Sequence, residues 1–190
     1  MSLGSRSIWI AACLLVGSGA AVSSRVPQPE KCAAAKTKAS ALAVSAQMQC
    51  QAKAASKGAA VDAQCLEKAE SRLRARFGKA DAKEECLGDA DSALAAAGAC
   101  TTAFADAVSG DASCVAKKLK AAGTSARAEA ACARKADEGD AIVCLAKAEK
   151  KLRDAIDKAD QHGTCTGTAD ELAALIDECV ITLGQPKSAH

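Results

Sequence analysis

Residues 65–86 read CLEKAESRLRARFGKADAKEEC, and residues 144–165 repeat this pattern as CLAKAEKKLRDAIDKADQHGTC. Eleven of the 22 aligned positions are identical, and both segments begin and end with cysteine. Apolar residues recur every three or four positions in each segment, which is typical of an amphipathic helix. We therefore expect the two segments to form equivalent helices.

The cysteines extend this repeat over most of the chain. Beyond residue 21, successive cysteines are separated by 18, 15, 21 and 14 residues, and then by 18, 12, 21 and 14. This spacing predicts two tandem homologous units of about 80 residues. We expect them to occupy residues 31–109 and 110–185, with a linker over 22–30 and a tail over 186–190.

The composition favours an all-α fold with three helices in each unit. Alanine, the best helix former, supplies 49 of the 190 residues, and the three prolines lie near the ends of the chain. Asp62 and Thr168 are expected to cap helix N-termini, Thr168 within a capping box. The helices are expected over residues 31–57, 62–85, 89–108, 112–137, 140–161 and 168–183.

The first 21 residues resemble a secretory signal peptide. Arg6 precedes an apolar run over residues 8–16 (IWIAACLLV), and small residues suited to cleavage follow over 17–21 (GSGAA). Residues 10–13 also fit a lipoprotein box loosely, but this interpretation leaves little apolar sequence before Cys13. No apolar run approaches the roughly 20 residues that a membrane-spanning helix needs. The sequence therefore predicts a secreted, extracellular or periplasmic protein without a membrane span.

An exported chain with ten cysteines favours a disulfide framework. Only 26 of the 169 residues beyond residue 21 are Leu, Ile, Val, Phe or Met, so cross-links are expected to compensate for a thin core. Heights along antiparallel helices predict the pairs Cys32–Cys86, Cys50–Cys65, Cys114–Cys165 and Cys132–Cys144. Cys100 and Cys179 remain. A bond between them across the two units is favoured over buried thiols or a link between chains.

Little in the sequence indicates catalysis or nucleic-acid binding. The chain has three aromatic residues and a net charge of +2, which argues against a nucleic-acid partner. It contains no phosphate-binding loop or nucleophile elbow, and its only histidines are His162 and His190. We therefore expect a non-enzymatic protein without a cofactor. Five lysines are expected to mark solvated helix faces: Lys53, Lys57, Lys117, Lys118 and Lys120.

Two functions remain open after these exclusions. The first is a secreted structural or binding module for an unknown protein or envelope partner, in an undetermined oligomeric state. The alternative is a thiol-based metal-binding or storage protein of the cell envelope. No Cys-x-x-Cys motif occurs, and His162 with Cys165 is the only His/Cys pair at ligand spacing. A count of free thiols on the native protein separates the two functions.

The segment over residues 50–70, with Cys50, Lys57-Gly58, Val61-Asp62 and Cys65 as its markers, resembles uncharacterised exported Cys/Ala/Lys-rich repeat proteins of bacteria. The resemblance covers most of the first unit and, more loosely, the second unit, where Glu138-Gly139 replaces Lys57-Gly58. It implies an exported helical repeat protein and carries no activity or site residues.

Overall fold

The computed structural model describes residues 28–83, 86–134 and 138–184, and these residues form six α-helices. Within them, an isolated bridge between Gly110 and Cys165 is the only β-type pairing, so the all-α prediction is confirmed. The predicted signal peptide and tail lie outside the described residues. The helices are α1 (Gln28–Lys57), α2 (Ala63–Asp81), α3 (Ala90–Ala107), α4 (Ala112–Cys132), α5 (Glu138–Asp160) and α6 (Ala169–Gly184).

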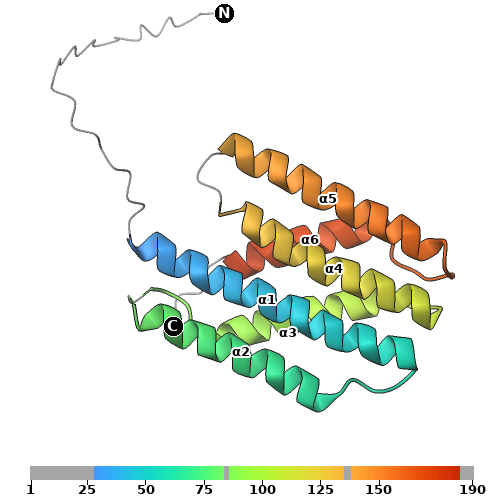
Figure 1. The fold of residues 1–190 in the computed structure, drawn as a ribbon, viewed down its shortest axis with the longest axis horizontal. Coiled ribbons are helices and arrows are strands. Elements are labelled where there is room, and N and C mark those ends of the chain that lie inside the picture. The colour runs from blue at the N-terminus through green and yellow to red at the C-terminus, as the bar shows by residue number, and fades with distance from the viewer. Residues whose placement is uncertain (1–27, 84–85, 135–137, 185–190) are drawn as a thin grey trace, which may run out of the picture.

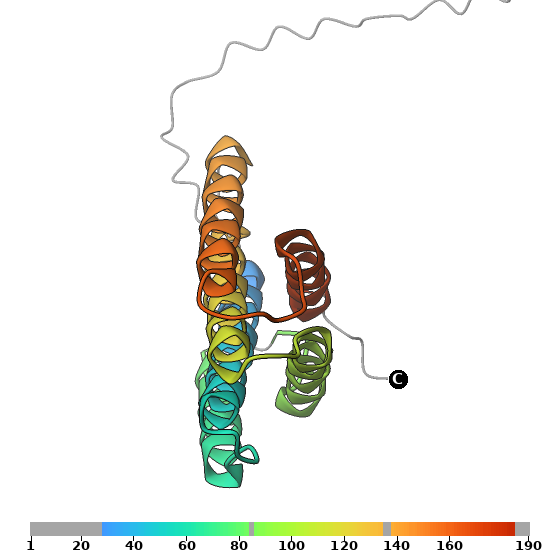
Figure 2. The same ribbon diagram turned by 90° about the vertical axis from the view of Figure 1, so that its right-hand side faces the viewer.

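The helices form two layers. Figure 1 shows α5, α4, α1 and α2 side by side in that order, with α1 and α4 in the centre. Figure 2 shows α3 and α6 together on one side of this four-helix layer. The other side of the four-helix layer, which faces the viewer in Figure 1, is called the outer face below.

The most extensive packing joins α1 to α4, one central helix from each half of the chain. A Cβ atom on Gly123 would lie 3.0 Å from Met48 Cβ and 3.3 Å from Ser45 O, so this close approach depends on glycine. The apolar core is continuous from α1 to α6. Its largest fully buried apolar side chains are Val44, Met48, Leu73, Phe104, Ile156, Leu172 and Ile176.

Each of the matching helices α2 and α5 buries one apolar stripe. The buried residues are Ala69, Leu73, Phe77 and Ala80 in α2, and Ala148, Leu152, Ile156 and Ala159 in α5. These lie at the helical spacing read from the sequence. The stripe is less buried toward the start of α5, where Leu145 is exposed.

Three helix boundaries differ from those expected. α1 begins at Gln28, within the predicted linker, because a proline such as Pro29 is compatible with the first turn of a helix. α2 ends at Asp81 and α4 at Cys132, each about four or five residues early. Residues 82–83 and 133–134 form turns at these two helix ends. The predicted caps at Asp62 and Thr168 are present.

All ten cysteines in the described residues form disulfides. The Cα atoms of the five pairs are 5.5 to 5.9 Å apart. Four pairs are those that helical heights predict, and the fifth is the bond between the two remaining cysteines, Cys100–Cys179, which joins α3 to α6. The pairs are Cys32–Cys86, Cys50–Cys65, Cys100–Cys179, Cys114–Cys165 and Cys132–Cys144.

Candidate functional site: a basic outer face above two buried lysines

The net charge of +2 conceals a strong separation of charge between the two layers. Among the described side chains of α1 and α4, every exposed charged residue is basic. By contrast, α3 and α6 contain six acidic residues and no Lys or Arg. The exposed basic residues of the two central helices are Lys31, Lys38, Lys53, Lys57, Lys117, Lys120 and Arg127.

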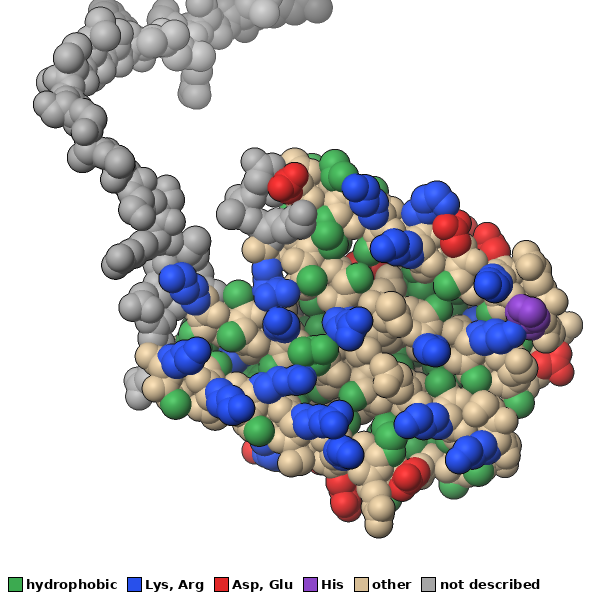
Figure 3. Space-filling view, in the orientation of Figure 1, with side chains coloured by type: hydrophobic (Ala, Val, Ile, Leu, Met, Phe, Trp, Pro, Cys, Tyr) green, Lys and Arg blue, Asp and Glu red, His purple; other side chains and the backbone are tan. Residues whose placement is uncertain are grey.

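Helical periodicity places these cations on a common surface. In α4, Lys117, Lys120 and Arg127 recur at steps of three and seven, which puts them on one side of the helix. Figure 3 shows Lys and Arg side chains spread across the outer face, with acidic side chains mainly toward its edges. We call the seven residues above the basic face.

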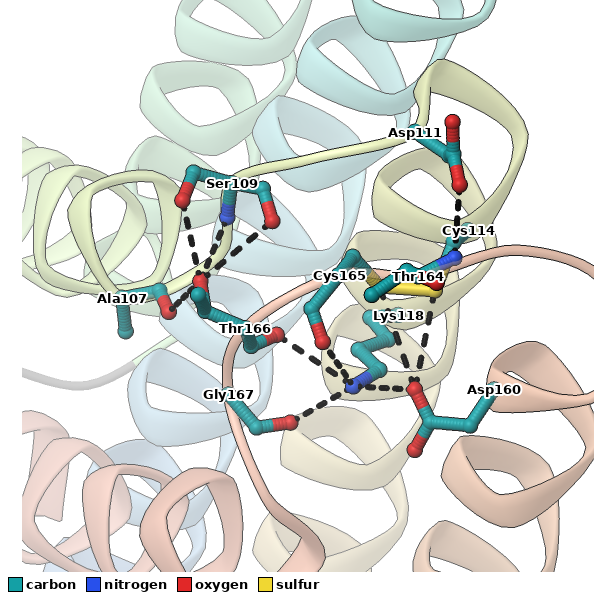
Figure 4. The surroundings of a disulfide bond; sticks show 10 residues. All are labelled: Ala107, Ser109, Asp111, Cys114, Lys118, Asp160, Thr164, Cys165, Thr166 and Gly167. Atoms are coloured by element: carbon teal, nitrogen blue, oxygen red, sulfur yellow. Dashed lines mark hydrogen bonds and ion pairs between the residues drawn. A yellow bond between two sulfur atoms is a disulfide. The ribbon is translucent and has the colours of Figure 1, made fainter.

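Beneath this surface, a buried lysine organises the loop that joins α5 to α6. Lys118 is 1% exposed, and its Nζ donates hydrogen bonds to the carbonyl oxygens of Cys165, Thr166 and Gly167 at 3.3, 3.2 and 2.8 Å. The same ammonium lies 2.6 Å from Asp160 Oδ1. Figure 4 shows Lys118 reaching this loop beside the Cys114–Cys165 disulfide.

The same loop is joined to the connection between α3 and α4. Thr164 N–H donates to Asp111 Oδ2 at 2.6 Å, and Asp111 N–H donates to Thr164 O at 2.9 Å. Thr166 N–H donates to Ser109 O at 2.8 Å. A Cβ on Gly110 would lie 2.8 Å from Cys165 Cα, so this contact requires glycine. These contacts attach the α3–α4 connection, which joins the two halves of the chain, to the α5–α6 loop (Figure 4).

A second buried lysine has an equivalent environment in the first half of the chain. Lys36 is 5% exposed, and its Nζ donates to the carbonyl oxygens of Cys86 and Gly88 at 2.8 and 2.7 Å. The ammonium pairs with Asp81 at 2.5 Å and lies 5.5 Å from the centre of the Phe77 ring. Each lysine thus satisfies loop carbonyls that would otherwise lose their hydrogen bonds on burial.

The expectation that Lys118 lies on a solvated helix face is therefore wrong. Helical periodicity does distinguish Lys118 from the exposed Lys117 and Lys120, because Lys118 lies four residues from both Cys114 and Ala122, on the buried side of α4. The sequence contains a second signal. Lys36 and Lys118 each lie four residues after the first cysteine of their half of the chain, at aligned positions. The solvated-face expectation holds for Lys53, Lys57, Lys117 and Lys120, all of which are exposed.

Both lysine sites also contain two cysteines and one aspartate with ligand atoms within 4.8 Å of one another. The groups are Cys32, Asp81 and Cys86, and Cys114, Asp160 and Cys165. In each group the two sulfurs are bonded to each other, and the carboxylate pairs with the buried ammonium. A metal ion would need thiolate sulfur, so these groups serve the fold in the oxidised chain. His162 is exposed, and Cys165 is already bonded to Cys114, so the thiolate that a metal would need is absent from this His/Cys pair too.

Glu129 is a buried carboxyl group on α4 that the sequence did not single out. It accepts a hydrogen bond from Ser125 Oγ at 2.8 Å. Burial raises the pKa of Glu129 to about 7, the nearby Asp177 and Glu149 carboxylates add to the rise, and the Ser125 bond opposes it. The aligned residue in the first half is Gln47, which is buried and accepts a hydrogen bond from Thr101 Oγ1 at 2.9 Å.

Glu129 is expected to make folding stability depend on pH. Its pKa in the folded chain, about 7, exceeds the ordinary value of 4.5, so the folded chain favours the protonated form. The contribution of Glu129 to the free energy of unfolding should therefore be fully present below pH 4.5. It should be lost as the pH rises through about 7, which lowers the free energy of unfolding by about 2–3 kcal/mol. Glu129→Gln should remove this fall and be more stable than the wild type at alkaline pH. Urea unfolding across this pH range, with the exposed Glu67→Gln as control, measures the effect. Parallel pH curves for wild type and Glu129→Gln would contradict it.

Comparison of the chain with known protein families, curated proteins and solved structures finds no match. No helix in the described part of the chain is long and apolar enough to cross a membrane. The described residues therefore form an all-helical, cysteine-rich protein whose disulfides are consistent with an oxidising compartment.

Proposed function

We propose that this chain is an exported, non-enzymatic binding module that uses the basic face to bind a polyanionic envelope or extracellular partner. The observation that carries this proposal is the separation of charge between the two layers. A surface with one sign of charge attracts a partner bearing repeated carboxylate, sulfate or phosphate groups, although the net charge is only +2.

The disulfides and the repeat support the same proposal. Five disulfides suit a secreted or periplasmic protein with a predicted signal peptide over residues 1–21. The aligned cysteines and the paired lysine sites support two homologous three-helix units. Because α1 and α4 pack in the centre of the four-helix layer, joining the units brings the basic stripes of both onto one face. A single unit would present only half of this surface.

Thiol-based metal storage receives less support from the same observations. The ten cysteines beyond residue 21 are bonded in pairs, and the two acidic groups beside them are occupied by ammonium groups. This bonding favours a binding module.

Charge removal on the basic face tests this function. The variant Lys38→Gln/Lys53→Gln/Arg127→Gln removes three exposed cations from α1 and α4. Its affinity for dextran sulfate should fall, and the slope of log affinity against log salt should shrink by about two to three, because each lost contact releases one counterion fewer. Affinity can be measured by fluorescence anisotropy with a labelled polymer at several salt concentrations.

A matched control tests whether the position of the cations or the net charge of the protein governs the affinity. The variant Arg74→Gln/Lys150→Gln/Arg153→Gln removes the same charge from residues that already pair with Asp91, Asp154 and Glu149. It should retain most of the affinity. Equal losses in both variants would show that net charge alone governs binding, and no binding by the wild type at low salt would refute the proposed function.

A further inference from the structure

A groove of about 400 Å³ lies between α4 and α5. Its volume falls within the range of small-molecule binding sites. Two facing stripes line it, one around Lys120 and Thr124 on α4 and one around Lys151, Ala155 and Lys158 on α5. None of Lys38, Lys53 and Arg127, the residues removed in the test above, lines the groove.

The groove combines an apolar floor with a cationic rim. Leu152 and five alanines supply the floor, and four lysines with His162 supply the rim. No acidic residue is among the lining residues. Such a lining is suited to a ligand with an apolar body and an anionic group.

The rim lysines also lack counter-ions. Within the described residues, Lys117, Lys120, Lys151 and Lys158 form no ion pair, whereas the nearby Lys150 and Arg153 of α5 pair with carboxylates. Like charges along both walls repel one another, and a bound anion would relieve this repulsion.

The other half of the chain fills the aligned positions with larger side chains. Leu42 aligns with Thr124, and Arg76 aligns with Ala155. Lys117 aligns with Ala35, but Lys120, Lys151 and Lys158 align with the basic residues Lys38, Arg72 and Lys79. The space of the groove is thus specific to the α4–α5 pair, whereas most of its charge is shared by both halves of the chain.

From this combination we infer that the α4–α5 groove binds a single-chain anionic amphiphile, with one alkyl chain and a carboxylate or phosphate head group. The alkyl chain lies along the floor formed by Leu152 and the alanines. The head group is bound by the ammonium groups of Lys120 and Lys151. The inference goes beyond the basic face, with which the groove shares Lys117 and Lys120, and assigns a second, smaller ligand to the groove.

Calorimetry with dodecyl phosphate below its micelle concentration tests this site. We expect binding of one dodecyl phosphate per chain, with weaker binding of dodecyl maltoside and dodecyltrimethylammonium, and none of inorganic phosphate. Laurate should bind as dodecyl phosphate does, because both carry one chain and an anionic head. Equal binding of dodecyl phosphate, dodecyl maltoside and dodecyltrimethylammonium would overturn the inference, since the lysines would then have no role.

Substitutions test separately how the volume of the groove and the charge of its rim affect the affinity for dodecyl phosphate. Ala155→Arg and Thr124→Leu introduce the residues of the first half and should each lower the affinity about tenfold or more by filling the groove, although Ala155→Arg adds a positive charge. Lys120→Gln/Lys151→Gln keeps the space and should lower the affinity about tenfold, because the head group loses its charge-assisted hydrogen bonds. Lys147→Gln/Lys150→Gln, on α5 outside the lining, is the control and should leave it unchanged. Circular dichroism verifies that each variant is folded.

Two further outcomes are decisive. Unchanged affinity in both Ala155→Arg and Thr124→Leu would place the ligand elsewhere and overturn the inference. Binding of anionic phospholipid vesicles without binding of monomeric dodecyl phosphate would assign the surface to a lipid bilayer and overturn it as well. The test is independent of the proposed function, because Lys38→Gln/Lys53→Gln/Arg127→Gln should bind dodecyl phosphate normally and Ala155→Arg should still bind dextran sulfate.

Discussion

Replacing Lys118 with methionine is expected to lower the free energy of unfolding by about 3 kcal/mol. Methionine keeps the apolar stem but removes the donor to the carbonyl oxygens of Cys165, Thr166 and Gly167. The bond to Gly167 is buried and the other two are partly buried, and each lost donor costs about 1 kcal/mol. Asp160 is half-exposed and stays solvated, so its lost ion pair adds little.

The loss should be specific to the buried lysines. Lys120→Met changes an exposed lysine two residues further along α4 and should alter stability by less than about 0.5 kcal/mol. Lys36→Met should cost about 2 kcal/mol, because Lys36 donates to two carbonyls and methionine can still pack on Phe77. A loss below about 1 kcal/mol in Lys118→Met would show that the loop does not depend on this ammonium.

Far-ultraviolet circular dichroism during urea unfolding measures these changes. Fluorescence is unsuitable, because the chain has no tyrosine and its only tryptophan, Trp9, lies in the predicted signal peptide. The double variant Lys118→Met/Asp160→Asn tests the pair directly. Its loss should equal that of Lys118→Met within about 0.5 kcal/mol, since the aspartate has no ammonium to bind once Lys118 is replaced.

Removing the disulfide between α3 and α6 is expected to have the largest effect. Cys100 and Cys179 are 79 residues apart, and loss of a cross-link over such a loop costs about 4 kcal/mol through the greater freedom of the unfolded chain. The Cys114–Cys165 bond already shortens the free path between them, so we expect Cys100→Ala/Cys179→Ala to lose about 3–4 kcal/mol. Alanine avoids placing an unpaired hydroxyl group at either buried position.

The variant should still fold, because α3 and α6 remain joined through Phe104, Leu172 and Ile176 in the shared core. Its helical circular dichroism should match that of the wild type, and its urea dependence should be steeper, since the unfolded chain exposes more surface. Thiol titration of the unfolded, unreduced protein verifies that the other four bonds are intact. An unchanged free energy of unfolding would show that the link between α3 and α6 contributes nothing beyond the core contacts.

Much of this architecture follows from local patterns in the chain. Apolar spacing places Leu73 and Phe77 on one side of α2, and the equivalent Leu152 and Ile156 on one side of α5. The cysteine spacing, combined with the rise of a helix, leads to the four disulfides within the two halves of the chain, because these depend on heights along consecutive helices. Cys100–Cys179 joins the two halves and follows only as the remaining pair. The ends of α2 and α4 differ from expectation, since turns at residues 82–83 and 133–134 end these helices despite good helix propensity.

The basic face, the groove and the partners of the buried lysines do not follow from these local patterns. Net charge sums over the chain, whereas the basic face depends on α1 and α4 becoming neighbours while α3 and α6 cover the opposite side. The burial of Lys118 likewise depends on a loop 47 to 49 residues away that supplies its acceptors.

The sequence by itself therefore determined the helices, their apolar sides and the disulfides within each half of the chain, because each of these depends on the order of residues along consecutive helices. Only the tertiary structure decided which groups the buried lysines bind, where the cations gather and where a groove opens between α4 and α5. Those properties depend on which helices become neighbours, and packing between distant segments establishes that.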